Sequence, residues 1–489
     1  MFFVAVGRSL LKHMVPFQEF TRLPTLEDWT RFIPYARRVH SLKRGIKLNE
    51  KERCWKILDS VFYDVARTRT TLEVLPNLRT LWWNSDTRHA TLFMHDKVTE
   101  FAFHISLDNL PSLCTDIVGR MPSLRSLGWT NSYVRRRSDS HNPKDDRELL
   151  QLISRLPKLR EVTPAKGAVG GKFLKALSSL LPELEAIRSN NLGEALGEMR
   201  YCTSPLRCVL QEGAFPKLYD LCLKSDLDDI RVYLTGGALL PRLRNLSVES
   251  GGGTEQTLTV QQFLTDVTRC YPTLEMVSMI LMVSTEEEYE CYPLSPEHLN
   301  PILSLKQLTR LELRHNHPLQ ISEVDLAEFG AALPAMENLV LNPEPFHLTR
   351  PEITLHSLLI VAQHFPNLFY LGIYLDAQGT ATPMPYLPAK TRLFPRLLTL
   401  HMGVSPIASD APVTMFLSRI LSENERVEIK SGILWNPELY EEEYEYLTTV
   451  SERRSKWDRV MGSLSLVMQL FKEDNAHRRD MEKEVKDEK

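Results

Sequence analysis

Two short stretches contain residue types that could support chemistry, and the first suggests phosphate binding. Residues 167–173 read Gly-Ala-Val-Gly-Gly-Lys-Phe, which is rich in glycine and ends near a lysine. A phosphate-binding loop needs four residues between its glycines and a Ser or Thr after the lysine. Here Phe173 follows Lys172. We interpret the stretch as a turn between structural units, and we predict no nucleotide and no other cofactor.

The second stretch, His315-Asn316-His317, places two imidazoles two residues apart. Imidazoles are common ligands of divalent metals, and a metal held this way could assist phosphodiester cleavage. No second metal-ligand cluster accompanies the pair, and a structural repeat, described below, explains Asn316. The sequence also contains no nucleophile elbow. We therefore predict no metal site and no enzymatic activity.

Composition points to a folded protein that binds neither nucleic acid nor membranes. The 489 residues are 43% hydrophobic and 25% charged, with a net charge of −3. The seven cysteines are scattered and include no Cys-x-x-Cys pair, as expected for reduced thiols inside a cell. The apolar run Met1–Val6 is too short for a signal peptide and has no positive charge before it. We expect a soluble protein in the cytoplasm or the nucleus.

The clearest pattern lies around the same histidines. Residues 308–316 read Leu-x-x-Leu-x-Leu-x-x-Asn, the core of a leucine-rich repeat. This spacing predicts a short strand with Leu311 and Leu313 on one side. Asn316 would then turn the chain away and satisfy neighbouring backbone groups with its amide.

A related phrase, Pro-x-apolar-x-x-apolar-x-apolar, recurs along most of the chain. It begins at Pro76, Pro122, Pro182, Pro216, Pro241, Pro272, Pro334, Pro366 and Pro395, with a degenerate copy at Pro157. Amphipathic runs such as 148–156, 172–181, 324–333 and 357–365 precede these prolines, with apolar residues three and four apart. Each unit therefore reads as helix, proline turn and strand, and neighbouring units must stack to bury their apolar faces.

The predicted fold class is α/β: a leucine-rich-repeat solenoid, a curved horseshoe of short parallel strands backed by helices, with helical caps at both ends. We assign residues 1–48 to the N-terminal cap and 49–437 to the solenoid. Residues 438–474 form the predicted C-terminal helical cap, because Trp457, Val460 and Leu464 keep helical spacing. The same face could instead dock a partner helix. We expect the mixed-charge tail, 475–489, to be disordered.

One part of the N-terminal cap resembles a known family. Residues 28–42 match the pattern D-W-x-R-F-x-x-Y-A-x-R-V-x-x-L at Asp28, Trp29, Arg31, Phe32, Tyr35, Ala36, Arg38, Val39 and Leu42. Read physically, Asp28 caps a short helix that carries Trp29, Phe32 and Tyr35 on one side. The pattern is similar to the segment after the F-box in fungal F-box proteins with leucine-rich repeats.

This resemblance implies that the chain recognises substrates for a cullin–RING ubiquitin ligase. Members of the family carry an F-box, a helical module before this segment that binds a Skp-type linker subunit. The residues before Phe20 are too few to hold an F-box, so we expect linker binding only if an F-box is present upstream. The alternative is an F-box-less leucine-rich-repeat scaffold or regulator without a ubiquitin-ligase link.

The residues between the repeat leucines are the candidate partner-binding positions, since they face away from the core. They differ from unit to unit, which suits a surface that binds one irregular protein partner. The middle units combine charged and aromatic residues, types enriched at binding hot spots. The candidate site comprises Arg310, Glu312, Arg314, Tyr370 and Tyr374. The sequence does not identify the partner.

Overall fold

A computed structural model describes most of the chain. The described residues are 3–6, 17–44, 56–105, 110–131, 143–165, 170–188, 206, 208–250, 257–281, 292–379, 393–421, 427–433 and 444–487. The chain forms two compact units. Unit 1 comprises residues 1–194 with 213–220 and 240–242, and unit 2 comprises the remainder to Lys489. Residues 167–169 and 135–137 are among those outside the described part.

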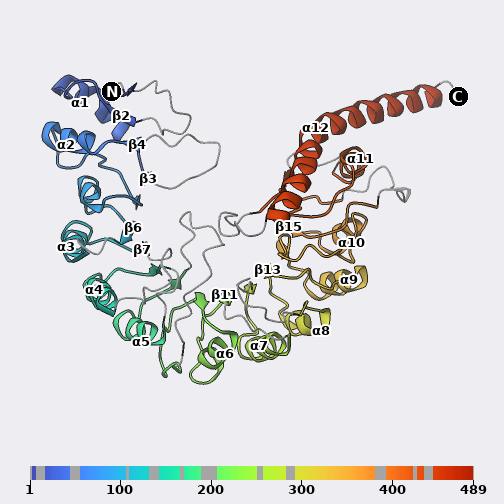
Figure 1. Cartoon of the computed structure of the whole chain (residues 1–489), viewed down its shortest axis with the longest axis horizontal. Coiled ribbons are helices and arrows are strands. Elements are labelled where there is room, and N and C mark those ends of the chain that lie inside the picture. Colours follow the sequence, from blue (N-terminus) through green and yellow to red (C-terminus); the bar gives the residue numbers. More distant parts are fainter. Residues whose placement is uncertain are drawn as a thin grey trace. The chain divides into compact units, whose positions relative to one another are not determined.

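Unit 1 is built on a parallel sheet in which strands that follow one another in sequence are also neighbours in the sheet. Its strands are β3 (Ser41–Arg44), β5 (Thr80–Trp83), β6 (Glu100–Ile105), β7 (Ser126–Asn131), β8 (Glu161–Thr163) and β9 (Ala186–Ile187). Helices α2 (Asp59–Thr68), α3 (Leu110–Arg120), α4 (Pro143–Ser154) and α5 (Gly171–Leu180) lie along one side of these strands (Figure 1). A 3₁₀-helix, η1 (Thr87–Leu92), takes the corresponding place after β5.

Unit 2 repeats the same arrangement. Its strands are β10 (Asp220–Lys224), β11 (Asn245–Ser250), β12 (Met276–Leu281), β13 (Arg310–His315), β14 (Asn338–Leu341), β15 (Tyr370–Ile373), β16 (Thr399–His401) and β17 (Glu428–Lys430). Its helices are α6 (Leu227–Thr235), α7 (Thr257–Cys270), α8 (Pro296–Leu299), α9 (Glu323–Ala332), α10 (Ser357–His364), α11 (Asp410–Ile420) and α12 (Tyr444–Asp487), with a 3₁₀-helix, η5 (Asn300–Ser304). The chain therefore has the predicted α/β leucine-rich-repeat solenoid fold.

The recurring proline forms the same turn in successive repeats. The residue before the proline accepts a hydrogen bond from the backbone N–H three positions on, as between Leu75 and Leu78 at 3.1 Å and between Leu333 and Met336 at 3.2 Å. Proline suits the second position of such a turn because its φ is fixed near −65°. The preceding residue is held out of the helical region, as at Leu333 with φ −121° and ψ 63°. Where it occurs, the proline thus ends the helix and leads into the strand. The turns before β6 and β13 form the same hydrogen bond with Asp96 and Lys306 at this position.

The leucines of the phrase form the core. Leu311 and Leu313 are 2% and 1% exposed, so they share the buried side of β13 as predicted. Leu326 and Phe329 of α9 are similarly buried, which places the apolar face of the helix against the strands. The strands and the helices bury their apolar sides against each other, so each repeat depends on its neighbours.

The N-terminal cap differs from the prediction in two details, the residue that caps its helix and the exposure of Tyr35. The N-cap of α1 (Leu26–Ala36) is Thr25, and Asp28 instead occupies the third helical position of a capping box. The Asp28 carboxylate accepts from the Thr25 backbone N–H at 2.8 Å, and Asp28 N–H donates to Thr25 Oγ1. Trp29 is buried and its Nε1 donates to Thr68 Oγ1 of α2. Tyr35 is 65% exposed, so it does not share the buried face.

A second, three-stranded sheet in unit 1 was not anticipated from the sequence. Strand β1 (Phe3–Val6) pairs antiparallel with β2 (Phe17–Phe20), and β2 pairs with β4 (Lys56–Ile57). The apolar run at the start of the chain therefore forms a strand. The parallel sheet itself already begins at β3, inside the segment assigned to the cap.

The C-terminal cap is one long helix, α12. Trp457, Val460 and Leu464 are buried, as their helical spacing predicts, and the helix packs against α11. Helix α12 continues to Asp487, past residue 475, where the charged tail begins. The sequence contains neither Pro nor Gly after Gly462, which leaves nothing to end the helix.

Among the described residues, no helix combines the length and the apolar character that a bilayer-spanning segment needs.

Candidate protein-binding surface on the open strand face

The side chains between the repeat leucines form what we call the open face of unit 2. Parallel pairing aligns one row of this face across successive strands, in the order Met276, Arg310, Asn338, Tyr370 and Thr399. Neighbouring strands lie about 4.8 Å apart, so adjacent members of the row are in contact range. The fold therefore brings Arg310 and Tyr370 of the candidate site to one surface, with Asn338 between them.

The turns that precede β15 and β16 extend this row with further exposed groups. The Arg396 guanidinium lies 5.7 Å from the centre of the Phe369 ring. The backbone N–H of Leu398 donates to Phe369 O, and the Leu398 side chain is 49% exposed. We name the set the Tyr370 surface. It consists of Arg310, Asn338, Phe369, Tyr370, Arg396, Leu398 and Thr399.

Two residues predicted to face outward are buried instead. Arg314 is 5% exposed and Tyr374 is 3% exposed. Tyr374 packs in an apolar cluster with Tyr446 and Val450 of α12, and its hydroxyl donates to Thr349 O at 3.0 Å. The capping helix thus covers this end of the open face. The sequence pattern gave the correct side of the strand but not the helix that covers it.

Arg314 is buried because it belongs to a network of polar side chains beneath the Tyr370 surface. Its Nε donates to Glu312 Oε1 at 2.6 Å, and its Nη1 donates to Glu344 Oε2 at 3.2 Å. Glu312 also accepts from Ser278 Oγ at 3.1 Å. A guanidinium between two carboxylates is compensated on both sides, which makes its burial tolerable.

The same network continues to Tyr370 through a histidine. Glu344 Oε1 lies 3.3 Å from His401 Nε2, and His401 Nδ1 lies 3.2 Å from the Tyr370 hydroxyl. When Nδ1 accepts from the hydroxyl, the neutral imidazole carries its proton on Nε2. His401 also has a hydrogen bond with the Gly432 backbone, and its Nε2 lies close to Glu344 Oε1 without forming a hydrogen bond to it. Glu344 and His401 are 2% and 1% exposed. The network therefore holds the Tyr370 hydroxyl in place, and Tyr370 as a whole is half-buried.

Burial and charge set the protonation states in the network. Burial, together with the charge of Arg314, lowers the pKa of His401 to about 4. Burial alone would lower the pKa of Arg314, but the charges of Glu344 and Glu312 raise it. Burial raises the pKa of Tyr370 to about 12. At neutral pH His401 is therefore neutral and forms no ion pair with Glu344, and Arg314 carries the compensating charge.

Asn342 forms side-chain contacts to the backbone of the kind that the sequence predicts for Asn316. Its Nδ2 donates to His315 O at 2.9 Å and His317 O at 2.7 Å, and its Oδ1 accepts from His315 N at 3.1 Å. Its φ of 46° lies in the left-handed region, which asparagine tolerates well. Asn316 is buried, and its carbonyl accepts from His347 N. These contacts hold the exits of β13 and β14 together.

The buried histidines of unit 2 make its stability depend on pH. Burial lowers the pKa of His315, like that of His401, to about 4 in the folded chain, against about 6.5 unfolded. The unfolded chain therefore binds more protons below pH 6.5, and stability is lost as pH falls from 6.5 towards 4. We expect the free energy of unfolding, measured by urea titration, to drop over this range by about 1.4 kcal/mol per unit of pKa shift. A His401→Gln variant should show a shallower drop, and an unchanged slope would contradict this assignment.

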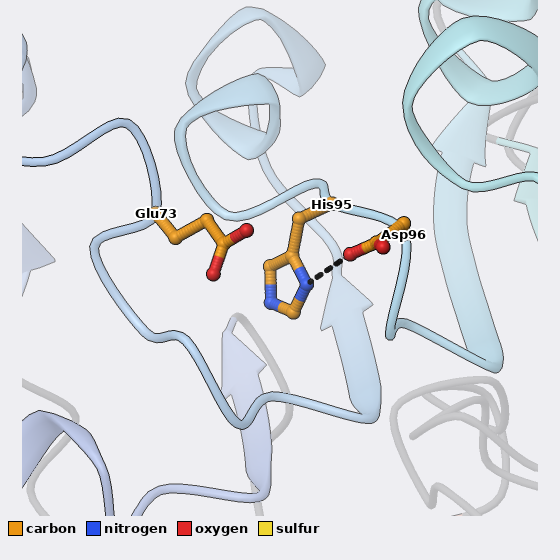
Figure 2. A group of neighbouring side chains, drawn as sticks. All are labelled: Glu73, His95 and Asp96. Carbon is orange, nitrogen blue, oxygen red and sulfur yellow. Dashed lines mark ion pairs between the residues drawn. The ribbon is translucent and has the colours of Figure 1, made fainter.

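One group of side chains in unit 1 has the composition of a metal site. Glu73, His95 and Asp96 place one ligand atom each within 4.8 Å of one another. In Figure 2 the two carboxylates flank the imidazole from opposite sides. His95 Nε2 lies 3.0 Å from Leu75 O, and Nδ1 accepts from Lys97 N at 3.3 Å. Both ring nitrogens thus contact the backbone. Such contacts are expected of a histidine that stabilises a turn rather than of one that binds a metal.

Comparison with known proteins adds limited information. No family model matches the chain, and no curated protein matches it in sequence. A chain in the crystal structure of the yeast Rad7 and Elc1 complex is 14% identical, with a TM-score of 0.42 over 72% of this chain and 74% of that chain. A chain in the complex of TLR13 with ssRNA13 is also 14% identical, with a TM-score of 0.18 over 73% and 68%. Similarities this low carry no argument about partners or ligands. The chain's own repeated helix, turn and strand establish its leucine-rich-repeat fold.

Proposed function

We propose that the chain is a protein-interaction module and that its partner docks on the Tyr370 surface. The observation that carries the proposal is the row itself. Within the four successive repeats of β13 to β16, it places an exposed arginine, an arginine stacked over a phenylalanine, a tyrosine and an exposed leucine. Arginine and large aromatic residues dominate protein–protein hot spots. The polar network beneath Tyr370 holds the ring in one orientation, so little conformational entropy is lost on binding.

We further propose that the chain acts as a substrate-recognition component of a cullin–RING ubiquitin ligase. The support is the pattern at residues 28–42, which is similar to the segment after the F-box in fungal F-box proteins with leucine-rich repeats. The alternative is a scaffold or regulator with no ligase link. Affinity purification of the tagged chain from its own cells separates the two. A Skp-type linker and a cullin should co-purify in the first case, and neither should in the second.

The Tyr370 surface can be tested without disturbing the network under it. We expect the triple variant Arg310→Ala, Phe369→Ala and Arg396→Ala to lose at least tenfold in the amount of partner captured, since each truncated hot-spot residue costs about 1–2 kcal/mol. Tyr370 stays intact because its removal would leave His401 without its hydroxyl contact. The measurement is quantitative mass spectrometry of the proteins captured by the wild-type chain and by the triple variant.

A matched variant distinguishes loss of binding from loss of folding. Leu258, Val324 and Met415 are exposed apolar residues on α7, α9 and α11, and their replacement with Ala should leave capture unchanged. Circular dichroism should show both triple variants folded. If the Tyr370 surface variant captures the same proteins at the same level as the wild type, this surface is not the docking site.

A further inference from the structure

Unit 1 carries a row of cations along the edge where its strands begin. Backbone hydrogen bonds align the residues just before successive strands. Thr99 N donates to Arg79 O at 2.9 Å, Arg125 N to Thr99 O at 2.8 Å, and Arg160 N to Arg125 O at 2.8 Å. Arg79, Thr99, Arg125 and Arg160 therefore stand side by side at the starts of β5, β6, β7 and β8.

A second row runs beside the first, two residues earlier in each repeat. It contains Asn77, Lys97, Ser123 and Lys158. Lys97 Nζ donates to Pro76 O at 3.1 Å, and Lys158 Nζ donates to Ser123 Oγ at 3.5 Å. We name the two rows, with His40 and Asp96, the basic ledge. Arg79, Lys97, Arg125 and Lys158 are all exposed.

The ledge is hollowed and its shape is fixed. A cavity of about 540 Å³ is lined by His40, Asn77, Arg79, Asp96, Lys97, Thr99 and Ser123. Asn77 Nδ2 donates to Arg37 O at 2.7 Å, and His40 Nδ1 lies 3.0 Å from Asn77 O. The polar floor is therefore organised before any ligand arrives, and it offers amide, hydroxyl and cationic groups together.

The charge on the ledge is largely uncompensated. Within the part of the chain that the structure describes, no ion pair is formed by Arg79 or Arg125. Asp96 is the one acidic residue lining the hollow. The cations stop at the next repeat, where Glu183 and Glu185 lie 3.8 Å from the Arg160 guanidinium. The ledge is thus a bounded basic strip four strands wide, or roughly 14 Å at 4.8 Å per strand.

These features favour an acidic protein segment over nucleic acid. An extended chain advances about 3.3 Å per residue, so roughly four or five residues would cross the strip. Grooves that bind single-stranded nucleic acid add aromatic side chains on which bases stack. The ledge residues include no Phe, Tyr or Trp. Its hydroxyl and amide groups suit carboxylates and the backbone of a peptide.

We propose that the basic ledge of unit 1 binds an extended, Asp/Glu-rich segment of a partner protein. The ledge is a second interaction surface, composed of different residues from the Tyr370 surface. Arg79 and Arg125 supply the free charges, and the hollow between them receives acidic side chains. Binding should weaken with added salt because every cation involved is exposed or half-exposed.

Fluorescence anisotropy with the full chain tests the proposal. The probe is a labelled short peptide of alternating Glu and Ser, and its counterpart has Gln at every Glu. A single-stranded oligothymidylate forms a third arm. We expect the Glu peptide to bind in preference to both others. The double variant Arg79→Glu and Arg125→Glu should weaken that binding about tenfold, since reversal replaces attraction with repulsion.

The matched control is Lys172→Glu with Lys175→Glu on α5, which makes the same change in net charge at exposed helix positions. This control variant should weaken binding of the Glu peptide less than twofold. If the charge-reversal variant fails to fold, a milder double variant, Arg79→Gln with Arg125→Gln, replaces it. We expect this variant to weaken binding of the Glu peptide several-fold. Equal losses in ledge and control variants, equal binding of the Gln peptide, or tighter binding of the oligothymidylate would each overturn the proposal.

Discussion

Replacing Trp457 with Ala is expected to destabilise unit 2 by about 3–5 kcal/mol, the range for removing a fully buried large aromatic side chain. Trp457 is 0% exposed, and its indole Nε1 donates to Ser405 O at 2.9 Å, so truncation leaves both a cavity and an unpaired carbonyl. Helix α12 would lose the buried side chain that packs it against the last repeats. Urea unfolding followed by circular dichroism measures the effect.

A conservative variant separates packing from hydrogen bonding at this position. Trp457→Phe keeps an aromatic ring but removes the donor to Ser405, and should cost about 1–2 kcal/mol. Leu466 lies on the same helix but is 62% exposed, so Leu466→Ala should change stability by less than about 0.5 kcal/mol. If Trp457→Ala unfolded at the wild-type urea concentration, α12 would not be a structural cap.

Replacing Glu344 with Gln is the second large effect that we expect, at about 3–5 kcal/mol, because it breaks a buried ion pair. The Arg314 guanidinium would keep its charge at 5% exposure while losing one of its two carboxylates. His401 Nε2 would face an amide in place of the carboxylate, and the Tyr370 hydroxyl would be held less firmly. We therefore expect a lower urea midpoint together with weaker partner capture.

Removing both charges should reverse most of this loss. A double variant, Arg314→Met with Glu344→Leu, leaves no buried charge unpaired and should be markedly more stable than Glu344→Gln. Arg459 offers a comparison, since it pairs with Asp410 and the two side chains are 54% and 35% exposed. Arg459→Ala should cost about 1 kcal/mol or less. A Glu344→Gln variant as stable as the wild type would show that the Arg314–Glu344 ion pair does not stabilise unit 2.

The repeats were predictable from the sequence because each signal is local. A proline after an amphipathic run ends the helix through its own geometry, as at Pro334, and the leucines that follow must share one side of a strand. These constraints act within a few residues. The helices, the strands and the buried leucines of β13 follow from them.

The details of the candidate site depend on contacts between distant residues. Glu344 lies between Pro343 and Pro345, where the sequence suggests only a loop, and its partners come from β13 and β16. Tyr374 is covered by α12, some 70 residues later in the chain. Alternation along a strand indicates which side a residue faces but not what covers that side. Arg314 lies on β13 as predicted and Tyr374 directly follows β15, but the prediction that both are exposed was wrong.

A photo-crosslinking amino acid at Asn338 tests the central claim most directly. Asn338 lies between Arg310 and Tyr370 in the aligned row, so a docked partner would contact it. Val324 on α9 is 67% exposed and provides the control position. In cells, illumination should join the Asn338-labelled chain to a discrete second protein, and the Val324-labelled chain should give no such product. Crosslinks from Val324 but not from Asn338 would contradict the assignment of the Tyr370 surface as the docking site.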